Sequence, residues 1–509
     1  MAGAAPAAGG RPEVRLERSK EDLNREFAML IDGEWVASAS GQTFSCVDPY
    51  TEEVWGRVPR ADAADVDRAV RAARRAFDVD GWPKTPPARR AALLRKLGQL
   101  IEENLDALVR QQIRENGRLV SEMRPGTGAV ANACYYYAGL AETFHGVSLP
   151  VSVPNITSYT LREPIGVVAA ITPWNAPLVL LGWKLLPALA AGNTLVIKPS
   201  EVTPTSTLLL AELVMKAGFP KGVVNVVTGY GDPTGIALVN HPGVDKIAFT
   251  GSTATGKKIA HAAAERNART SLELGGKSPN IIFADAELDN AVNGAMAGVF
   301  SATGQACMAG SRVLIENKVY DEVAGRIAAQ AKKMIPGDPL DPKTQLGPLA
   351  SKMQLDKVLG YFQIAKKEGI EVLTGGKRLD RKGYFVEPTV FSKVSNACAV
   401  AREEIFGPVV SLLPFDGEDQ AVAIANDTSY GLAAGVWTEN VRRAHRMVQR
   451  LRAGTVWVNN YRLVSHAVPF GGYKQSGVGR EMGPEALNEF TEIKSVWIDT
   501  GNKINFPVG

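Results

Sequence analysis

The spacing of hydrophobic and polar residues changes along the chain. Over residues 62–78 and 86–115, Ala and Leu recur at helical spacing among Arg and Glu, and Pro86 and Pro87 mark the start of the second segment. From Gly166 onward, short β-rich runs alternate with helical segments. This alternation predicts a parallel, doubly wound sheet.

The alternation forms two series, which predict two α/β domains. In the first, strands are expected at 166–172, 193–199, 223–229 and 246–252, and helices at 178–191, 204–217 and near 233–240. After Leu274, strands are expected at 278–283, 311–316, 409–415, 431–438 and 454–460, and helices at 287–301 and about 318–334. The β-rich segments SYTLREP (158–164) and KSVWIDTG (494–501) are expected to pair outside either core, and pairing between subunits is one use of such strands.

Length and composition restrict the class of protein. A chain of 509 residues is too long for one simple core and predicts two or three domains. Hydrophobic content of 45% and a net charge of +4, with Lys and Arg scattered among acids, indicate a soluble protein whose partner is neither nucleic acid nor an acidic membrane. The most apolar stretch, 165–197, is interrupted by Pro173, Asn175, Lys184, Pro187 and Asn193, so no membrane helix of about 20 residues is expected.

The cysteines and the N-terminus indicate the compartment. Cys46, Cys134, Cys307 and Cys398 show no CxxC spacing and no closely spaced histidines, which argues against a metal site and against a disulfide framework. A reducing cytoplasm fits best. Residues 1–26 are predicted to be a disordered tail, because the chain begins with small residues and the acids that follow break any signal-peptide pattern.

Cys307, in the sequence GQAC, has Glu273, in LELGGKSPN, as its best candidate partner. A thiolate attacks carbonyl carbon and a carboxylate takes a proton from water, so this pair suits a path through a thioester. A cysteine hydrolase would normally use a histidine. The histidines at 145, 241, 261, 445 and 466 form no recognisable signature with Cys307, although the sequence leaves their spatial proximity open.

The segment KIAFTGSTATGKK resembles a phosphate loop, because Gly251 and Gly256 follow a strand and introduce a helix. A nucleoside triphosphatase loop needs Ser or Thr after its lysine, and here Lys258 follows Lys257. A dinucleotide site is the better match, with amides, the helix dipole and the Ser252 hydroxyl as donors to a pyrophosphate. A plain glycine turn explains this stretch equally well.

Two further segments carry candidate binding groups. Lys198 and Glu201 follow the strand NTLVIKP, where they would bind ribose hydroxyls, and Glu201 would repel a 2′-phosphate, which favours NAD over NADP. Asn175 lies between Pro173 and Pro177, where a rigid loop suits an oxyanion donor beside the Cys307 N–H. Taken alone, each segment more commonly has a structural role.

Seven ordered motifs together resemble the NAD(P)-dependent aldehyde dehydrogenase superfamily, in its hydrolytic, non-acylating type. They are ITPWNAP, WKLLPALAAGNTLVIKPSE, FTGS, LELGGKSPNI, GQAC, EEIFGPV and PFGGYKQSGVGRE, and the resemblance runs from about Asp32 to Ile498. It implies an α/β fold with two Rossmann-like parallel-sheet domains and a small β-flap for oligomerisation. The expected parts are an NAD-binding domain at 27–141 and 165–275, a catalytic domain at 276–475, and the flap with the C-terminal segment at 142–164 and 476–505.

The resemblance also implies residue roles. The nucleophile falls on Cys307, the general base on Glu273, the oxyanion amide on Asn175, and a proton relay on Lys184 and Glu481, for which a snorkelling lysine and a surface acid are the structural alternatives. The implied cofactor contacts are Ile171, Thr172, Trp174, Lys198, Ser200, Glu201, Gly231, Gly251, Ser252, Leu274, Glu404 and Phe406.

The implied reaction converts an aldehyde to a carboxylic acid. Cys307 adds to the aldehyde, Asn175 stabilises the oxyanion, NAD receives the hydride, and Glu273 activates water to hydrolyse the thioester. Glu273 favours this hydrolysis over the CoA-acylating reaction. An acylating or reductive relative, or a non-catalytic protein that retains the fold, are the alternatives.

The expected assembly is a dimer or a tetramer (a dimer of dimers). The substrate tunnel is expected to be apolar. Its candidate wall residues are Val179, Trp183, Ser301, Met308, Arg462, Val464 and Phe470. The small or flexible residues near the nucleophile predict a roomy throat that favours aromatic or medium-chain aldehydes. Arg462 could bind the carboxylate of a semialdehyde, although a surface or interface arginine is the more common case.

Overall fold

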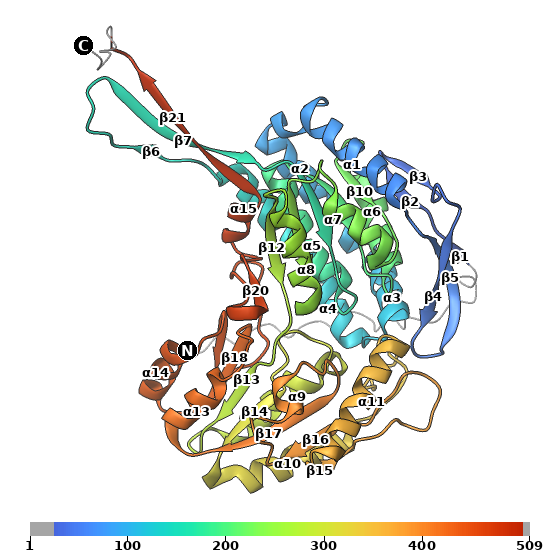
Figure 1. Cartoon of the computed structure of the whole chain (residues 1–509), viewed down its shortest axis with the longest axis vertical. Coiled ribbons are helices and arrows are strands. Elements are labelled where there is room, and N and C mark those ends of the chain that lie inside the picture. The colour runs from blue at the N-terminus through green and yellow to red at the C-terminus, as the bar shows by residue number, and fades with distance from the viewer. Residues whose placement is uncertain (1–24, 502–509) are drawn as a thin grey trace, which may run out of the picture.

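The computed structural model describes residues 25–501, which form two α/β units and a projecting β-ribbon. Figure 1 shows the first unit above the second, with the ribbon extending from the first. The expected tail, 1–26, lies outside the described residues except for Arg25 and Glu26. These two residues form β1, which pairs with β5 (Glu53–Pro59), and β5 also pairs with β4 (Thr43–Asp48).

The first unit is built on an eight-stranded sheet with a parallel centre. Its order is β20 (Gly477–Val478), β12 (Arg269–Glu273), β11 (Lys246–Thr250), β8 (Val167–Ile171), β9 (Thr194–Lys198), β10 (Val224–Val226), β2 (Met29–Ile31) and β3 (Glu34–Val36). The five strands from β12 to β10 are parallel. The outer strands pair antiparallel.

The central strands of this sheet are buried on both sides because helices cover both of its faces. One face packs against α2 (Pro87–Glu103), α4 (Val120–Thr143), α5 (Pro177–Ala191) and α6 (Pro204–Ala217). The other packs against α1 (Ala63–Asp78), α7 (Ile236–Asn240) and α8 (Thr253–Ala264). The predicted doubly wound architecture is therefore confirmed for this unit.

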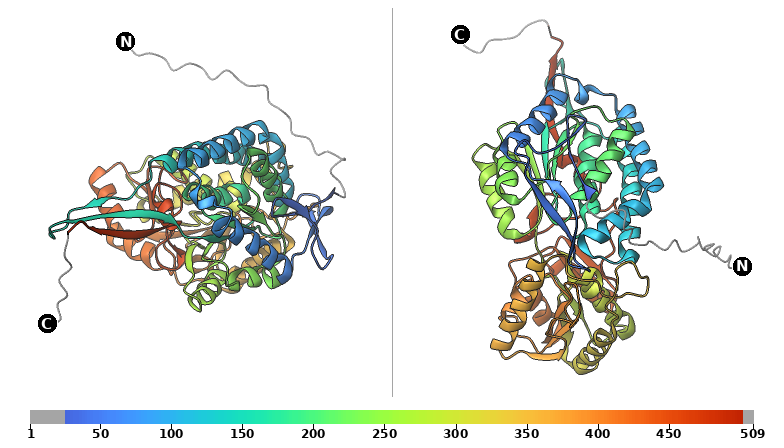
Figure 2. Two further views of the ribbon diagram at one scale, coloured as in Figure 1. Left: turned by 90° about the horizontal axis from the view of Figure 1, so that it is seen from above. Right: turned by 90° about the vertical axis from the view of Figure 1, so that its right-hand side faces the viewer.

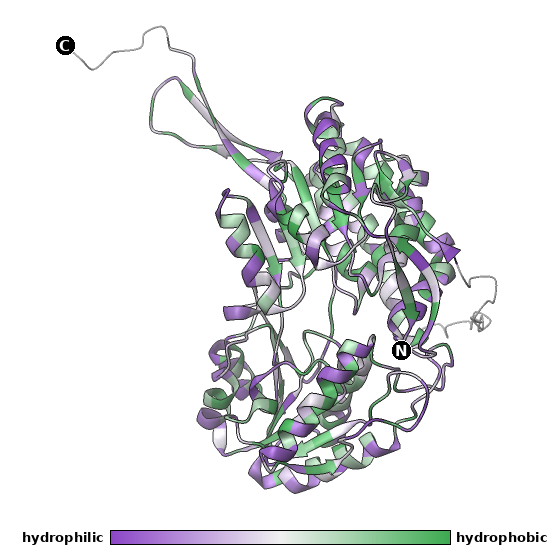
Figure 3. Ribbon diagram, turned by 45° about the vertical axis from the view of Figure 1, so that its right-hand side comes forward, coloured by the Kyte–Doolittle hydropathy of each residue, from purple (hydrophilic) through white to green (hydrophobic). Residues whose placement is uncertain are grey.

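The second unit repeats this design around a seven-stranded sheet. Its order is β15 (Glu371–Thr374), β16 (Thr389–Ser392), β17 (Val409–Phe415), β14 (Arg312–Glu316), β13 (Pro279–Ile282), β18 (Ala433–Trp437) and β19 (Thr455–Val458), parallel except at β15. One face carries α9 (Leu288–Phe300) and α10 (Tyr320–Lys333). The other carries α11 (Lys352–Lys367), α12 (Ala399–Arg402), α13 (Gly417–Asn426) and α14 (Val441–Arg450). Figure 3 shows the apolar strands inside and the polar helix faces outside.

The ribbon consists of β6 (Ser148–Leu149), β7 (Ile156–Pro164) and β21 (Thr491–Asp499), and the short α15 (Glu485–Glu489) precedes β21. Strands β7 and β21 pair antiparallel over their full length. The ribbon extends away from both units in two perpendicular views (Figure 1, Figure 2). The two predicted β-rich segments therefore pair with each other outside either core.

Two helical regions differ from the sequence-based expectation. The segment 86–115 forms two helices, α2 and α3 (Leu105–Asn116). The helix is interrupted at Asn104, whose side-chain Nδ2 donates a hydrogen bond to the Leu100 carbonyl at 2.8 Å. Helix α4 was not predicted, since Pro125 and three glycines obscure its pattern. Within residues 25–501, every helix is either too short or too polar to cross a membrane.

Candidate active site

A cavity of about 700 Å³ lies at the carboxyl ends of β8, β9 and β11. The chain reverses its direction across the sheet between β8 and β11, which is where open α/β sheets bind ligands. Nine of the twelve predicted cofactor residues line this cavity. They are Ile171, Thr172, Trp174, Lys198, Ser200, Glu201, Gly231, Gly251 and Ser252.

Polar groups in this cavity come from strand ends and from a helix N-terminus. Lys198 is buried at the end of β9, where its Nζ donates to the Pro199 carbonyl at 2.9 Å. Burial lowers the pKa of Lys198 to about 8, and the charge of Glu201 acts against this shift. Ser252 caps α8, since its Oγ accepts from the Thr255 N–H at 3.2 Å.

Leu274 has a packing position beneath this cavity rather than in its wall. A Cβ atom on Gly256 of α8 would lie 2.4 Å from Leu274 Cδ2. Glycine at residue 256 therefore lets α8 pack closely on the end of β12, which is one function of glycine in dinucleotide-binding turns. Leu274 thus supports the helix whose N-terminus faces the cavity.

The remaining predicted cofactor residues, Glu404 and Phe406, approach from the second unit. The Phe406 ring lies 5.3 Å from that of Trp174, at an interplanar angle of 89°. Glu404 Oε1 accepts from the Gly276 N–H at 3.0 Å. These contacts place Phe406 against Trp174 of the cavity wall and Glu404 against the segment that follows Glu273.

The loop that carries the predicted nucleophile leaves α9 through a short turn, Ser301–Gly304, in which Ala302 and Thr303 have left-handed φ angles of 57° and 53°. Cys307 follows and is partly exposed. Asn175 is buried at 7% exposure, and its Nδ2 donates to the Gln305 carbonyl at 2.9 Å. The structure therefore brings Asn175 to the loop that carries Cys307.

Gly275 and Gly276, which follow Glu273, allow the chain to pass close to Cys307. A Cβ atom on Gly276 would lie 2.4 Å from the Cys307 carbonyl oxygen, and one on Gly275 would lie 2.5 Å from Glu404 Oε2. Any side chain at either position would separate these groups. Burial and the charges of Glu273 and Glu404 raise the pKa of the Cys307 thiol to about 12, while the Met308 N–H acts against this shift.

Glu273 lies at the end of β12 and is 4% exposed. Its Oε1 has no hydrogen-bond partner among residues 25–501. Burial and the charge of Glu481 raise the pKa of Glu273, and Lys184 acts in the opposite direction. Lys184 is fully buried, forms an ion pair with Glu481, and donates to Thr250 Oγ1 at 2.5 Å.

Four predicted wall residues and Cys307 gather in one apolar cluster. Trp183 and Phe470 lie in the cluster core with ring centroids 5.4 Å apart, and Val179, Met308 and Cys307 pack against them. The core of this cluster is completed by three residues that were not predicted from the sequence, Leu180, Leu432 and Met482. Their apolar character alone does not distinguish them from ordinary core residues.

The other predicted wall residues are not among the apolar members of this cluster, although the charge of Arg462 acts on Cys307. Arg462 Nη1 donates to the carbonyls of Ser301 at 3.1 Å and Ala297 at 3.4 Å, so the arginine and Ser301 contact each other. Val464 is 47% exposed. Glu122, which was not predicted from the sequence, also contacts this turn, since its Oε1 accepts from the Ala302 N–H at 2.6 Å. No motif signalled this residue, which lies 180 positions before its partner.

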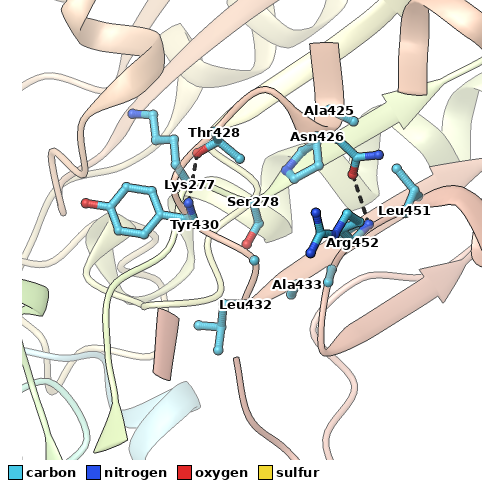
Figure 4. A pocket seen from close by; sticks show the side chains of 14 residues that line it. Lys277, Ser278, Ala425, Asn426, Thr428, Tyr430, Leu432, Ala433, Leu451 and Arg452 are labelled. Atoms are coloured by element: carbon cyan, nitrogen blue, oxygen red, sulfur yellow. Dashed lines mark hydrogen bonds between the residues drawn. The ribbon is translucent and has the colours of Figure 1, made fainter. Parts of the chain in front are cut away.

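A second cavity lies beside Lys277, Ser278, Tyr430 and Leu432 (Figure 4). Its volume of about 10 Å³ accommodates at most one water molecule. The Lys277 side chain extends away from Ser278 and Leu432 in this view. This cavity is therefore too small to bind a substrate.

Comparison with known proteins identifies the family. Residues 35–496 match the model of the aldehyde dehydrogenase family. The chain belongs to this family. DhaS of Bacillus subtilis is 50% identical over 472 residues, which cover 92% of this chain and 95% of DhaS. Aldehyde dehydrogenase 1A1 of Mus musculus is 46% identical over 478 residues, which cover 93% of this chain and 95% of the mouse protein.

A solved relative confirms the fold of this aldehyde dehydrogenase. The NAD+ complex of aldehyde dehydrogenase from Bacillus cereus matches with a TM-score of 0.94 and 46% identity, covering 96% of this chain and all of that one. The resemblance inferred from the seven motifs is therefore confirmed, and so is the α/β fold class. The protein is an enzyme that oxidises aldehydes.

Proposed function

We propose that this enzyme oxidises an aldehyde to a carboxylic acid with NAD, through a thioester on Cys307. The observation that carries the proposal is the Asn175 amide, held 2.9 Å from the Gln305 carbonyl in the nucleophile loop. In this role, Asn175 Nδ2 and the Cys307 N–H donate to the oxyanion that forms when the thiolate adds to the aldehyde.

The cavity between β8 and β11 suits NAD. Its polar groups match a dinucleotide, with the N-terminus of α8 for a pyrophosphate and the strand-end residues Lys198 and Glu201 for a ribose. When bound, NAD supplies the hydride acceptor. The bound NAD+ of the Bacillus cereus relative supports this assignment. Glu201 further favours NAD over NADP, because a carboxylate repels a 2′-phosphate.

We assign the remaining contacts to orientation and binding. Glu404 would hold the ribose next to the nicotinamide, and Phe406 would border it against Trp174. In this division of roles, residues 27–141 and 165–275 bind NAD, residues 276–475 carry the nucleophile, and residues 142–164 with 476–505 provide the flap.

Hydrolysis is assigned to Glu273. Its buried, unpartnered Oε1 can accept a proton from water, and its raised pKa makes it a stronger base than an exposed carboxylate. Lys184 and Glu481 are the next ionisable groups and can carry that proton away from Glu273.

The substrate class that the tunnel favours is a neutral aromatic or medium-chain aldehyde. The walls near Cys307 are apolar, with Trp183 and Phe470 in contact. A semialdehyde would need the Arg462 guanidinium for its carboxylate, and Nη1 of that group already donates to two main-chain carbonyls. This arrangement supports a neutral substrate.

The second candidate function is the CoA-acylating reaction of a related dehydrogenase. Product analysis with NAD, with and without CoA, separates the two functions. Carboxylic acid in both mixtures is expected, because Glu273 is present to activate water. Acyl-CoA as the main product would contradict hydrolysis, and failure to form NADH with any member of an aldehyde panel would contradict NAD-dependent oxidation.

We also propose a homo-oligomer, a dimer or a tetramer built as a dimer of dimers, in the cytoplasm. The projecting ribbon exposes apolar side chains, including Trp497 at 62% and Ile493 at 59%, which an isolated subunit would leave in water. The four cysteines are free thiols, which supports a reducing compartment.

A further inference from the structure

We propose that Arg118, Glu122 and Arg462 form a clamp that positions the nucleophile loop relative to Asn175. These are positioning residues, and their role rests on the proposed function of Cys307 and Asn175. The clamp acts on one peptide group, the one that joins Ser301 to Ala302.

This peptide group is bound from both sides. Its N–H donates to Glu122 Oε1 at 2.6 Å, and its carbonyl accepts from Arg462 Nη1 at 3.1 Å. Each hydrogen bond involves a charged side chain, and such bonds are stronger than those between neutral groups. The Ser301–Ala302 peptide is therefore fixed in orientation as well as in position.

The fixed peptide precedes a strained turn. Ala302 and Thr303 both adopt left-handed φ angles, which residues with a Cβ atom rarely do. Such a conformation persists only where surrounding contacts impose it. Among these contacts, Glu122 and Arg462 hold the start of the turn, five and six residues before Cys307. Further along the turn, Thr303 Oγ1 donates to the Gly347 carbonyl at 3.2 Å.

The same clamp reaches the oxyanion asparagine through Arg118. Arg118 Nε and Nη2 each lie 3.2 Å from Glu122 Oε2, and Nη1 donates to the Asn175 carbonyl at 3.1 Å. The side chains of Arg118 and Glu122 are 14% and 18% exposed, so solvent screens this pair less than a surface pair. One ion pair therefore connects the main chain of Asn175 to the turn before Cys307.

This connection links the two donors of the proposed oxyanion site. One donor is Asn175 Nδ2, and the other is the Cys307 N–H. Stabilisation of an oxyanion requires both donors at hydrogen-bond distance from one oxygen, and a misplacement of about 1 Å can lower a rate by about a hundredfold. The clamp fixes the relative position of the segments that carry these donors.

The test compares Glu122→Ala and Glu122→Gln with a matched ion pair elsewhere. Glutamine retains an oxygen for the Ala302 N–H but loses the charge that pairs with Arg118. The control is Glu322→Gln on α10, because Glu322 pairs with Arg326 at 3.3 Å with the same i,i+4 spacing and contacts neither loop. Rates are expressed per Cys307 thiol, so that any unfolded fraction is removed from the comparison.

Three measurements distinguish positioning from a general structural role. The first is the pre-steady-state rate of NADH formation with saturating aldehyde, which requires the oxyanion donors. The second is the KM for NAD. The third is the rate at which iodoacetamide alkylates Cys307, a displacement that forms no oxyanion.

We expect Glu122→Ala to lower the NADH rate about a hundredfold, and Glu122→Gln to restore part of this loss. The KM for NAD and the alkylation rate should stay within about threefold of wild type, as for a neutral substitution. An unchanged NADH rate, or an alkylation rate that falls by the same factor, overturns the clamp. If wild-type enzyme forms no NADH, the proposed function fails instead, and the clamp fails with it.

Discussion

The ammonium group of Lys184 and the carboxylate of Glu481 form an ion pair although 297 positions separate them in the chain. Their side chains are 0% and 5% exposed. Lys184 comes from α5, and Glu481 follows β20, so the pair joins two segments of the first unit beside Glu273. The charge of Lys184 opposes the burial that raises the pKa of Glu273.

Replacement of Lys184 should therefore change the pH dependence of hydrolysis. In Lys184→Met, the pKa of Glu273 rises further, since its opposing cation is gone. A general base works only when ionised, so the acidic limb of the profile should move to higher pH by about one unit or more. Rapid-quench measurement of acid release across pH checks this shift. Lys382→Met, at an exposed ion pair, is the control. An unmoved acidic limb would contradict this electrostatic effect of Lys184 on Glu273.

Glu273→Gln should separate the two halves of the reaction. Formation of the first NADH does not require activation of water, so a burst of one NADH per thiol should remain. Later turnover should fall by a factor of about 10² to 10⁴, the usual contribution of a general base. Stopped-flow absorbance gives both phases. The control is Glu322→Gln, at the exposed ion pair with Arg326 on α10. Loss of the burst together with turnover would exclude a role confined to hydrolysis.

Glu201→Ser should weaken the preference for NAD over NADP. Without the carboxylate, a 2′-phosphate no longer meets a like charge in the cavity. The ratio of kcat/KM for NADP to that for NAD should rise by about tenfold or more, since like-charge juxtaposition costs several kcal/mol. Glu265→Ser, at the end of α8 and outside the cavity, should leave the ratio unchanged. An unaltered ratio in Glu201→Ser would refute the assignment.

Trp183→Ala should reduce activity on large aldehydes selectively. Trp183 packs on Phe470 in the cluster that includes Cys307, so benzaldehyde and hexanal should lose contacts that acetaldehyde never makes. In wild type, the larger aldehydes should have the higher specificity constants, and the variant should lower these by about tenfold, or about 1.4 kcal/mol. Trp35→Ala, at a residue 43% exposed, is the control. A panel in which acetaldehyde has the highest specificity constant contradicts the apolar tunnel.

Glu115 should make stability depend on pH. Its buried carboxylate accepts from the Thr205 N–H at 2.5 Å and the Ser206 N–H at 3.2 Å, yet burial raises its pKa from 4.5 to about 7. Because the folded-state pKa is the higher one, the stabilisation is complete below pH 4.5 and is lost as the pH rises through 7. The shift corresponds to about 3 kcal/mol.

The unfolding free energy of wild type is compared with that of Glu115→Gln, whose side chain at residue 115 cannot titrate. Between pH 4.5 and 7.5, the unfolding free energy of wild type should fall relative to this variant by about 3 kcal/mol. Denaturant midpoints at each pH measure the difference. A constant difference between the two proteins would show that Glu115 does not titrate in this range.

The sequence alone determined the fold class and the family, because both depend on local patterns. Strands β8, β9 and β11 are short apolar runs followed by turn residues, and the motifs that contain Asn175, Glu273 and Cys307 occur in a recognisable order. Such patterns follow from periodicity and turn chemistry over a few residues. The resemblance that these motifs carry implied nine of the residues that line the cavity at the ends of β8, β9 and β11.

Only the tertiary structure decided which side chains support these residues. Helix α4 has a weak pattern, and nothing near Glu122 in the sequence indicates Ala302 as its partner. The partner of Arg462 was not predicted either. Substrate binding was one hypothesis for this residue, whereas its guanidinium contacts the main chain of Ser301. The physical reason is that a motif records local backbone geometry, whereas a hydrogen bond across 180 residues depends on how helices and sheets pack.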